Sequence, residues 1–464
     1  MKFFRSSGKT TNNAIEDRRV YMTTTPVRKL IPKLAVPSII SMLVTSLYNI
    51  VDTFFVGQIS TQATAAVGVV LPLMAIFQAF GFFCGHGSGN YISMKLGSRE
   101  IREAEIMSAN GFFLAFGIGL CISVLGLCFV RPLAGILGAT DTIIEDTIRY
   151  MSIILLGAPF TTSQFVINNQ LRFEGSASYA MVGIASGAVI NIVLDPILIF
   201  GLGMGVRGAA IATVIGQIIS FSVLLYGTSL GPNIRIRFRN LKLNARYLTL
   251  IARGGTPSLV RQALNSVSVM IMNLIAGAIA GDAAIAAMSI TGRIMMVSFS
   301  ALIGFGHGFQ PVCTFSYGAG LYSRMREARS FCIRYGTIFM TVAAALMFAF
   351  APQLIRFFRN DPEVIAIGTR ALRYLVLAFP LGAYTMMNSM LCQAINMSKR
   401  ATFLSAARSG VCYIPILLVL THFFGLDGLV MSQMWADIGT FLLTIPVAVS
   451  VLRELPNEDR NTAS

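Results

Sequence analysis

Residues 34–57 read LAVPSIISMLVTSLYNIVDTFFVG, an apolar stretch with a single charged side chain, that of Asp52. As a helix that rises about 1.5 Å per residue, this stretch is long enough to cross the roughly 30 Å hydrocarbon core of a bilayer. A charge at membrane depth costs on the order of 3 kcal/mol, so it needs a partner or a function. The stretch therefore predicts a transmembrane helix whose carboxylate is paired or functional.

The rest of the chain follows the same pattern. Hydrophobic residues make up 55% of the 464 residues, charged residues make up 12%, and the mean hydropathy is +0.71. Soluble domains carry about twice this share of charge, so we expect an all-α polytopic membrane protein. Apolar stretches predict about twelve transmembrane helices, near 34–57, 64–90, 107–131, 147–170, 179–201, 206–228, 249–278, 284–312, 328–352, 367–390, 402–424 and 428–452.

The basic residues indicate how these helices are oriented. The net charge is +16, and with the N-terminus inside, roughly 27 of the 36 Lys and Arg residues fall in cytoplasmic loops. One of these loops reads IRIRFRNLKLNAR at 234–246. The asymmetry predicts that both termini are cytoplasmic, and it accounts for the basic excess without a nucleic-acid partner.

No sequence pattern points to catalysis or to a metal site. The seven cysteines fall in or beside apolar segments, without CxxC or Cys/His ligand spacing. The sequence also lacks paired histidines, a phosphate-binding loop and a Ser/His/Asp arrangement. We therefore expect that the protein is not an enzyme and needs no cofactor.

The two halves of the chain match each other at an offset of about 220 residues. Five short matches keep the same order: Pro37-Ser38 with Pro257-Ser258, Gly85-His86-Gly87 with Gly306-His307-Gly308, Leu96-Gly97 with Tyr317-Gly318, Arg102-Glu103-Ala104 with Arg326-Glu327-Ala328, and Ile148-Arg149-Tyr150 with Leu372-Arg373-Tyr374. Six helices per repeat give both halves the same orientation, so a pseudo-two-fold axis should run along the membrane normal. We expect a flexible cytoplasmic tail at 1–26, an N-lobe at 27–230, a cytoplasmic linker at 231–247, a C-lobe at 248–453 and a second cytoplasmic tail at 454–464.

Several strings also resemble those of a known family. They are the stretch around Asp52, LRFEG at 171–175, NIVLDP at 191–196 and GHGFQPVCTFSYGAG at 306–320. Together they resemble the MATE (multidrug and toxic compound extrusion) family, most closely its bacterial MepA-like branch. The resemblance implies a V-shaped transporter of two six-helix lobes around a central cleft, in the inner membrane of a prokaryote. It also implies export of cationic or amphipathic drugs in exchange for H⁺ or Na⁺, and we expect a monomer.

Four oxygen-bearing residues are expected at similar depths in the N-lobe. Asp52 lies about 27 Å along its helix, and Asp195 lies about 24 Å along a helix that starts on the same side. Asn191 shares a helical face with Asp195, and Thr213 lies about 12 Å into a helix that starts outside. Such oxygens suit Na⁺, and two close carboxylates can also hold a proton. The resemblance implies that these four form the cation-coupling site; structural hydrogen bonding between helices is the alternative.

Other polar residues in the predicted helices are candidates for substrate contact. Tyr48 stands one turn before Asp52, and Asn168, Asn169 and Gln78 are amides in apolar surroundings. For the asparagine pair, hydrogen bonding between helices explains the pattern equally well.

Two prolines predict irregular backbone near the acids. Pro37 leaves a carbonyl without its helical partner, so the first helix can bend there. Pro196 biases Asp195 away from ideal helix. The resemblance implies that the first helix changes shape as the acids load or release their cation; a static kink is the alternative.

The second half lacks a matching pair of acids. Its first helix carries Arg261-Gln262, and the stretch 367–390 has no acid after its basic entrance, which argues against a second acidic cation site. Arg293 and Asp437 are expected at equal depth, which predicts an ion pair that locks two helices together. A substrate contact is the alternative role, and Arg261 is the competing partner.

The histidines of the two Gly-His-Gly strings, His86 and His307, are expected near helix ends. They serve either helix packing or a proton relay. The function we expect is secondary active multidrug export by alternating access. The alternative is a flippase or exporter of lipid-linked sugars or polysaccharide, which often has extra helices or a strongly basic cavity.

Overall fold

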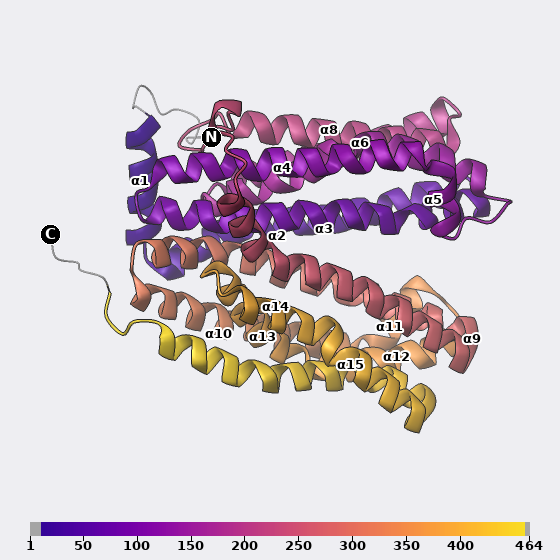
Figure 1. Cartoon of the computed structure of the whole chain (residues 1–464). Helices are drawn as coiled ribbons and strands as arrows, with labels where there is room; N and C mark the ends of the chain where they lie inside the picture. The colour runs from indigo at the N-terminus through magenta and orange to yellow at the C-terminus, as the bar shows by residue number, and fades with distance from the viewer. Residues whose placement is uncertain (1–10, 460–464) are drawn as a thin grey trace.

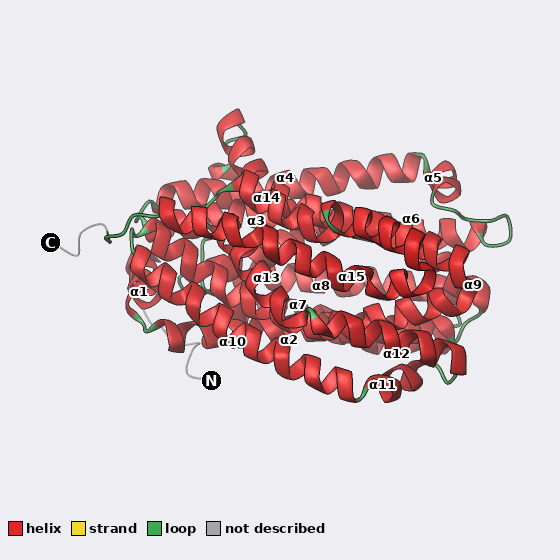
Figure 2. Ribbon diagram, turned by 90° about the horizontal axis from the view of Figure 1, so that it is seen from below, coloured by secondary structure: helices red, strands yellow, loops and turns green. Residues whose placement is uncertain are grey.

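The computed structural model describes residues 11–459, and helices account for most of them. The first group comprises α1 (Thr11–Thr24), α2 (Val27–Gly57), α3 (Thr61–Gly97), α4 (Ile101–Cys128), α5 (Val130–Ile136), α6 (Ile144–Phe173), α7 (Ala177–Pro196), the π-helix η1 (Ile197–Gly201) and α8 (Gly205–Gly227). After the short 3₁₀-helix η2 (Phe238–Asn240) follow α9 (Ala245–Gly318), α10 (Tyr322–Ala349), α11 (Ala351–Phe358), α12 (Pro362–Leu377), α13 (Phe379–Ala394), α14 (Ser398–Ala406), the π-helix η3 (Ala407–Val411) and α15 (Tyr413–Glu454). Within this described range the chain forms no strand (Figure 2).

The described residues contain ten helical segments that are long and apolar enough to cross a membrane. The long α9 supplies two of them, Ala245–Ile279 and Ala283–Gly318, because the chain breaks at Gly281, where φ is 61°. The pair α12 and α13, which meet at an angle of 53°, makes an eleventh crossing.

The last apolar segment, Ser398–Glu454, also consists of two crossings. Its backbone breaks at Gly425, where φ is 53°, a value that glycine adopts without the strain of a Cβ. Arg408 and Asp437 lie on opposite sides of this break, yet their side chains are 3.1 Å apart. A straight helix would separate two such positions by about 40 Å, so the chain turns back at Gly425. Dividing the segment there confirms the predicted twelve transmembrane helices.

The helices form two bundles that lie side by side (Figure 1). In the first bundle α3, α4, α6, α7 and α8 pack on one another, and α2 packs on α7; the second bundle is built on α9. The bundles meet along α2, α3 and α9. Figure 1 shows them close together at the end that carries α1, which we call the terminal end, and farther apart toward α5 and α11. The fold is therefore the expected all-α, V-shaped pair of bundles.

Glycines at the contact between the bundles leave room for the backbone of the neighbouring helix. A Cβ added at Gly308 of α9 would lie 2.6 Å from the backbone nitrogen of Ala35 in α2, and one at Gly304 would lie 2.5 Å from Cα of Ile39. Real Cβ atoms do not approach backbone this closely, so these two positions require glycine for the helices to pack as they do.

The expected flexible tail is wrong for the part of it that the structure describes. Residues 11–24 form α1, and Ile15 and Met22 on this helix are buried. Residues 1–10 lie outside the described residues. Arginines on α1 and on α10 form the hydrogen bonds that attach the helix, and tertiary contacts of this kind are not visible in local sequence.

Candidate functional site

Three helices bring the four predicted cation-coupling residues together. Asp52 lies on α2, Asn191 and Asp195 lie one turn apart on α7, and Thr213 lies on α8. Asp195 is fully buried, Asn191 and Thr213 are each 2% exposed, and Asp52 is half-buried. Asp52 and Asp195 are close enough to repel each other electrostatically. The four residues therefore gather in one cluster, and its role as a cation site stays a prediction.

The Asn191 side chain connects the two other members of the cluster on α7 and α8. In the orientation that satisfies both ends of the amide, its nitrogen donates to Asp195 Oδ2 at 3.0 Å and its oxygen accepts from the Thr213 backbone N–H at 3.1 Å. The amide thus fixes one oxygen of Asp195 and leaves the other available.

Two buried carboxylate oxygens in this cluster accept no hydrogen bond in the described structure. They are Oδ1 of Asp52 and Oδ1 of Asp195. A buried oxygen without a partner costs about 1–3 kcal/mol, and more when it is charged. Oxygens from two carboxylates, an amide and a hydroxyl are also the ligand types that a hard cation takes. The donor set therefore fits a proton or a Na⁺ ion.

Tyrosines lie next to the acids. Tyr48 of α2 and Tyr150 of α6 both interact with Thr213 and lie within electrostatic range of Asp52 and Asp195. Tyr48 was expected to contact substrate, whereas Tyr150 was not expected to belong to the site. The sequence signal for Tyr150 was its place in the Ile148-Arg149-Tyr150 repeat match, which carried no information about depth.

Pro196 was expected to bias Asp195 away from ideal helix, but Asp195 keeps α-helical backbone within α7, and the helix becomes irregular only after Pro196. α7 ends at Pro196 and continues as the π-helix η1, and π-turns are often found beside functional sites. Pro37, in contrast, lies inside an unbroken α2. A change of shape in α2 therefore stays a prediction.

Of the remaining substrate candidates, Asn168 and Gln78 form hydrogen bonds between helices, whereas Asn169 is hydrogen-bonded within α6. Asn168 Nδ2 donates to the Ala180 carbonyl at 3.1 Å, which ties α6 to α7. Asn169 accepts a hydrogen bond from Arg172. Gln78 of α3 accepts from Gln262 Nε2 at 3.1 Å, and this bond joins the two bundles. Contact of these residues with substrate stays a prediction.

The predicted ion pair between Arg293 and Asp437 is wrong. Asp437, 4% exposed, accepts from Arg408 Nε at 3.1 Å and from Gln433 Nε2 at 3.1 Å, whereas Arg293 is exposed. Arg261, the competing partner, instead lies within electrostatic range of Arg408. Equal depth along two helices did not determine which faces point at each other, and this was decided by how the helices pack.

Buried basic side chains also meet where the bundles touch. Arg172 of α6 forms a hydrogen bond with His307 Nδ1 of α9, and the ring centroids of His86 and His307 lie 6.1 Å apart. All three residues are buried. The two Gly-His-Gly strings thus pack against each other across the bundle interface. Arg172 was not among the predicted site residues, because it follows the predicted end of its apolar stretch at residue 170.

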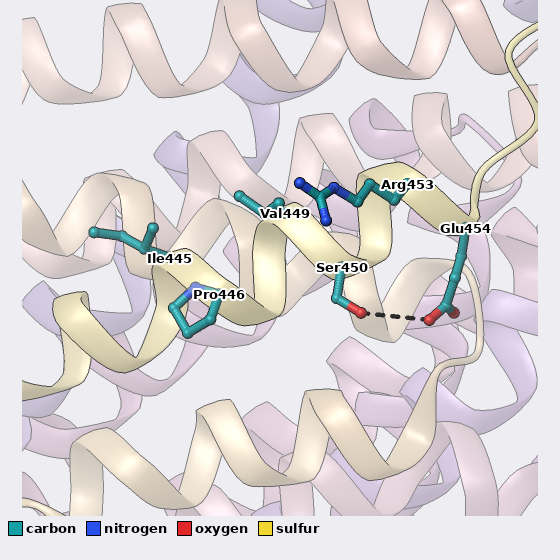
Figure 3. A pocket seen from close by; sticks show the side chains of 6 residues that line it. All are labelled: Ile445, Pro446, Val449, Ser450, Arg453 and Glu454. Atoms are coloured by element: carbon teal, nitrogen blue, oxygen red, sulfur yellow. Dashed lines mark hydrogen bonds between the residues drawn. The ribbon is translucent and has the colours of Figure 1, made fainter.

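A shallow groove on the outer side of α15 lies away from this chemistry. Its volume is about 480 Å³, and it is lined by Ile445, Pro446, Val449, Ser450, Arg453 and Glu454 (Figure 3). None of the predicted site residues lines it. Among the residues that the structure describes, no group of three or more His, Cys, Asp or Glu side chains is arranged to hold a metal ion.

Comparison with known proteins shows similarity over nearly the whole chain. The chain is 26% identical over 442 residues to the multidrug export protein MepA of Staphylococcus haemolyticus strain JCSC1435, with 95% of this chain and 97% of that protein covered. It is also 26% identical over 425 residues to MepA of Staphylococcus aureus strain MRSA252, with 91% and 93% covered. A crystal structure of MATE in complex with MaL6 superimposes with a TM-score of 0.89 at 25% identity and covers 97% of this chain and 99% of that one.

A family model gives the assignment. The model for MatE matches residues 37–197 and again residues 257–419. The two matches begin 220 residues apart (257 − 37), which is the offset of the internal repeat. They cover more than half of the chain. The chain therefore belongs to the MatE family of membrane transporters.

Proposed function

We propose that the protein is a secondary active multidrug exporter that exchanges cationic or amphipathic organic compounds for H⁺ or Na⁺. The coupling cation binds in the first bundle at Asp52, Asn191, Asp195 and Thr213. The observation that carries this proposal is that two carboxylates meet in one cluster, each with a buried oxygen that accepts no hydrogen bond in the described structure. The similar MepA proteins are multidrug export proteins, which supports export as the direction.

The electrostatics of the cluster explain how it can couple transport to a cation. Two carboxylates held close together inside the protein, one of them fully buried, are unfavourable when both are charged and unpaired. Binding a proton or a Na⁺ ion removes this repulsion, so the cation stabilises whichever arrangement of α2, α7 and α8 brings Asp52 and Asp195 together. A cation that favours one arrangement over another shifts the equilibrium by its difference in affinity.

The arrangement of the bundles supports alternating access. The bundles are packed together at the terminal end and separate toward the other end (Figure 1). The terminal end carries basic loops such as 234–246, so it belongs on the cytoplasmic side under the positive-inside rule. In this orientation both termini lie in the cytoplasm of a bacterial cell. The end at which the two bundles are packed together then faces the cytoplasm.

A sugar-lipid flippase is the alternative function. The two carboxylates favour the antiporter, because flipping a lipid-linked sugar does not require a cluster that binds a cation. The experiment is efflux of a fluorescent organic cation from proteoliposomes in which either a pH gradient or a Na⁺ gradient is imposed.

We expect that Asp52→Asn and Asp195→Asn each lower efflux at least about tenfold, since each removes a charge that the coupling cation neutralises. Asp427→Asn is the matched control, because Asp427 is an exposed acid paired with Arg370 outside the cluster. Normal efflux by both cluster variants at normal expression would refute the coupling role. Efflux driven by a pH gradient alone identifies the ion as H⁺, and an absolute need for Na⁺ identifies it as Na⁺.

A further inference from the structure

We propose that Asp437 and Phe299 form a second binding site, in the second bundle, for the positively charged group of an organic cation, and that the Arg408 side chain occupies this site in the present structure. The inference rests on the proposed export of organic cations and adds to it a place where the cation binds. It is separate from the coupling cluster, which lies in the first bundle.

The guanidinium of Arg408 is held by two different kinds of group. Its Nε donates to Asp437 Oδ1 at 3.1 Å, and its Cζ lies 4.1 Å from the centroid of the Phe299 ring. Phe299 in turn packs edge-to-face on Phe379, with ring centroids 5.1 Å apart. A carboxylate on one side and an aromatic face on the other is the arrangement that binds organic cations. The chain's own cation occupies that arrangement here.

Arg408 is held less firmly than its partners. Its side chain is 33% exposed, whereas that of Asp437 is 3% exposed. Among the described residues only Nε of its guanidinium donates to the carboxylate, so the bidentate geometry of a strong Arg–carboxylate pair is missing. The Asp437 carboxylate is therefore buried and fixed, whereas the Arg408 side chain can move away from it.

The backbone that carries Arg408 is irregular. Arg408 lies in the π-helix η3, between α14 and α15, where the regular helix hydrogen bonding is interrupted. Such one-turn irregularities inside helices occur often at functional sites. A side chain mounted there can be moved with less loss of packing than one in the middle of a regular helix.

The pair lies near the contact between the two bundles. Arg261 of α9 is within electrostatic range of Arg408. The next residue, Gln262, donates a hydrogen bond to Gln78 of the first bundle. A compound held between the bundles would therefore lie close to Arg408. Arg261 also adds a repulsion that raises the energy of Arg408 in its present place.

Exchange of one cation for another keeps the buried carboxylate neutralised. Removing Arg408 alone would leave Asp437 buried without a counter-charge, which is strongly unfavourable. An organic cation that enters as Arg408 swings out avoids that state and gains the Phe299 face. The side chain of Arg408 thus competes with the substrate, and it keeps the site neutral when no substrate is bound.

The test measures binding to purified protein without any ion gradient. Two probes of the same shape and opposite charge are used, tetraphenylphosphonium and tetraphenylborate, by equilibrium dialysis at pH 8. We expect Arg408→Ala to lower the Kd of tetraphenylphosphonium about tenfold, because the competing cation is gone, and to leave tetraphenylborate no tighter. Asp437→Asn should raise the Kd of tetraphenylphosphonium about tenfold.

A second variant keeps the ion pair and so protects the test against misfolding. Phe299→Leu removes only the aromatic face, and it should raise the Kd of tetraphenylphosphonium about three- to tenfold. Arg370→Ala is the matched control, because it also removes an arginine from an ion pair with an aspartate. That pair is exposed, with Arg370 Nη1 2.9 Å from Asp427 Oδ1. It should leave both Kd values unchanged.

The result that would overturn the site is a folded Arg408→Ala protein that binds tetraphenylphosphonium no more tightly than wild type, or a Phe299→Leu protein with unchanged affinity. If the wild-type protein shows efflux driven by a pH or Na⁺ gradient but the expected changes in Kd are not seen, only the proposed site at Asp437 and Phe299 is wrong. If wild type shows no cation-driven efflux, the proposed function itself is wrong.

Discussion

At the scale of single residues, a buried acid lies outside the membrane-spanning helices, between α6 and α7. Glu174 is 2% exposed, and its Oε2 accepts from the Ile234 backbone N–H at 3.0 Å. Arg18 of α1 donates to the Glu174 carbonyl at 3.3 Å and to Asn233 at 2.7 Å. Burial raises the pKa of the Glu174 carboxyl from its ordinary 4.5 to about 7, and the Ile234 N–H and Arg18 offset only part of this shift.

This pKa predicts how stability depends on pH. Below pH 4.5 the carboxyl is protonated in both states, and between pH 4.5 and about 7 only the folded protein holds the proton. The unfolded state then binds fewer protons, so Glu174 lowers the free energy of unfolding as pH rises through this range, by on the order of 3 kcal/mol in all.

Glu174→Gln should therefore raise the thermal unfolding midpoint at pH 8 and leave it nearly unchanged at pH 4.5. The measurement is thermal unfolding of the purified protein in detergent at both values. Glu105→Gln is the control, because Glu105 is a more exposed acid paired with Arg102 on the same side of the protein. A Glu174→Gln protein that unfolds at the wild-type temperature at pH 8 would contradict the shifted pKa.

At the scale of elements, the long α9 decides how closely the bundles approach. Gly308 faces the backbone of α2 with no room for a Cβ, whereas Gly292 on the same helix has nothing within 4 Å of the place where its Cβ would lie. The two glycines look alike in sequence, since both interrupt apolar helix. Only the partner helix distinguishes them.

We predict that Gly308→Ala destabilises the closed arrangement at the terminal end by about 1–3 kcal/mol, because backbone atoms of α2 must move. The measurement is the distance between spin labels at positions 98 and 399, which are exposed on the two bundles, in a protein whose native cysteines are replaced. The distance distribution should broaden toward larger separations. Gly292→Ala is the matched control and should keep the wild-type distance distribution. If Gly308→Ala also keeps the wild-type distribution, Gly308 does not limit how closely α9 approaches α2.

At the scale of the whole molecule, α1 joins the two bundles at the terminal end. On the first bundle, Arg19 Nε donates to the Gly97 carbonyl at 2.8 Å. From the second bundle, Arg324 of α10 donates to the Met22 carbonyl at 2.9 Å and also to the Thr25 carbonyl. The helix therefore contributes to holding the bundles together where they are closed.

Arg324→Ala should loosen α1, because two hydrogen bonds from a charged donor are lost, each worth about 1.5–3 kcal/mol. The expected result is hydrogen–deuterium exchange at the α1 amides that is at least about tenfold faster. The control is Arg326→Ala, two residues along the same helix, whose guanidinium binds the Leu455 and Pro456 carbonyls at 3.0 and 2.9 Å and does not contact α1. Unchanged exchange in Arg324→Ala would mean that the hydrogen bonds from Arg324 do not hold α1 in place.

The meeting of Asp52, Asn191, Asp195 and Thr213 could be predicted because it depends on distances along helices; their proposed role in coupling remains to be tested by efflux. Helix rise is nearly constant, so counting residues from a predicted end gave usable depths for Asp52 and Asp195. The repeat offset was equally readable, since it is a property of the sequence alone. Asp437 pairs with Arg408 and not with the predicted Arg293. Counting residues along a helix gives a depth, but it does not give the rotation of one helix against another.

By itself, then, the sequence determined the membrane-spanning helices, the two-fold repeat and the family, because apolar run length, helix rise and repeated strings are local properties of the sequence. Tertiary structure alone decided which side chains meet: Asp437 with Arg408, His307 with Arg172, and α1 with both bundles. These contacts depend on helix rotation and on the close approach of backbones at positions such as Gly308. Such packing is set by many side chains at once, and no single stretch of sequence records it.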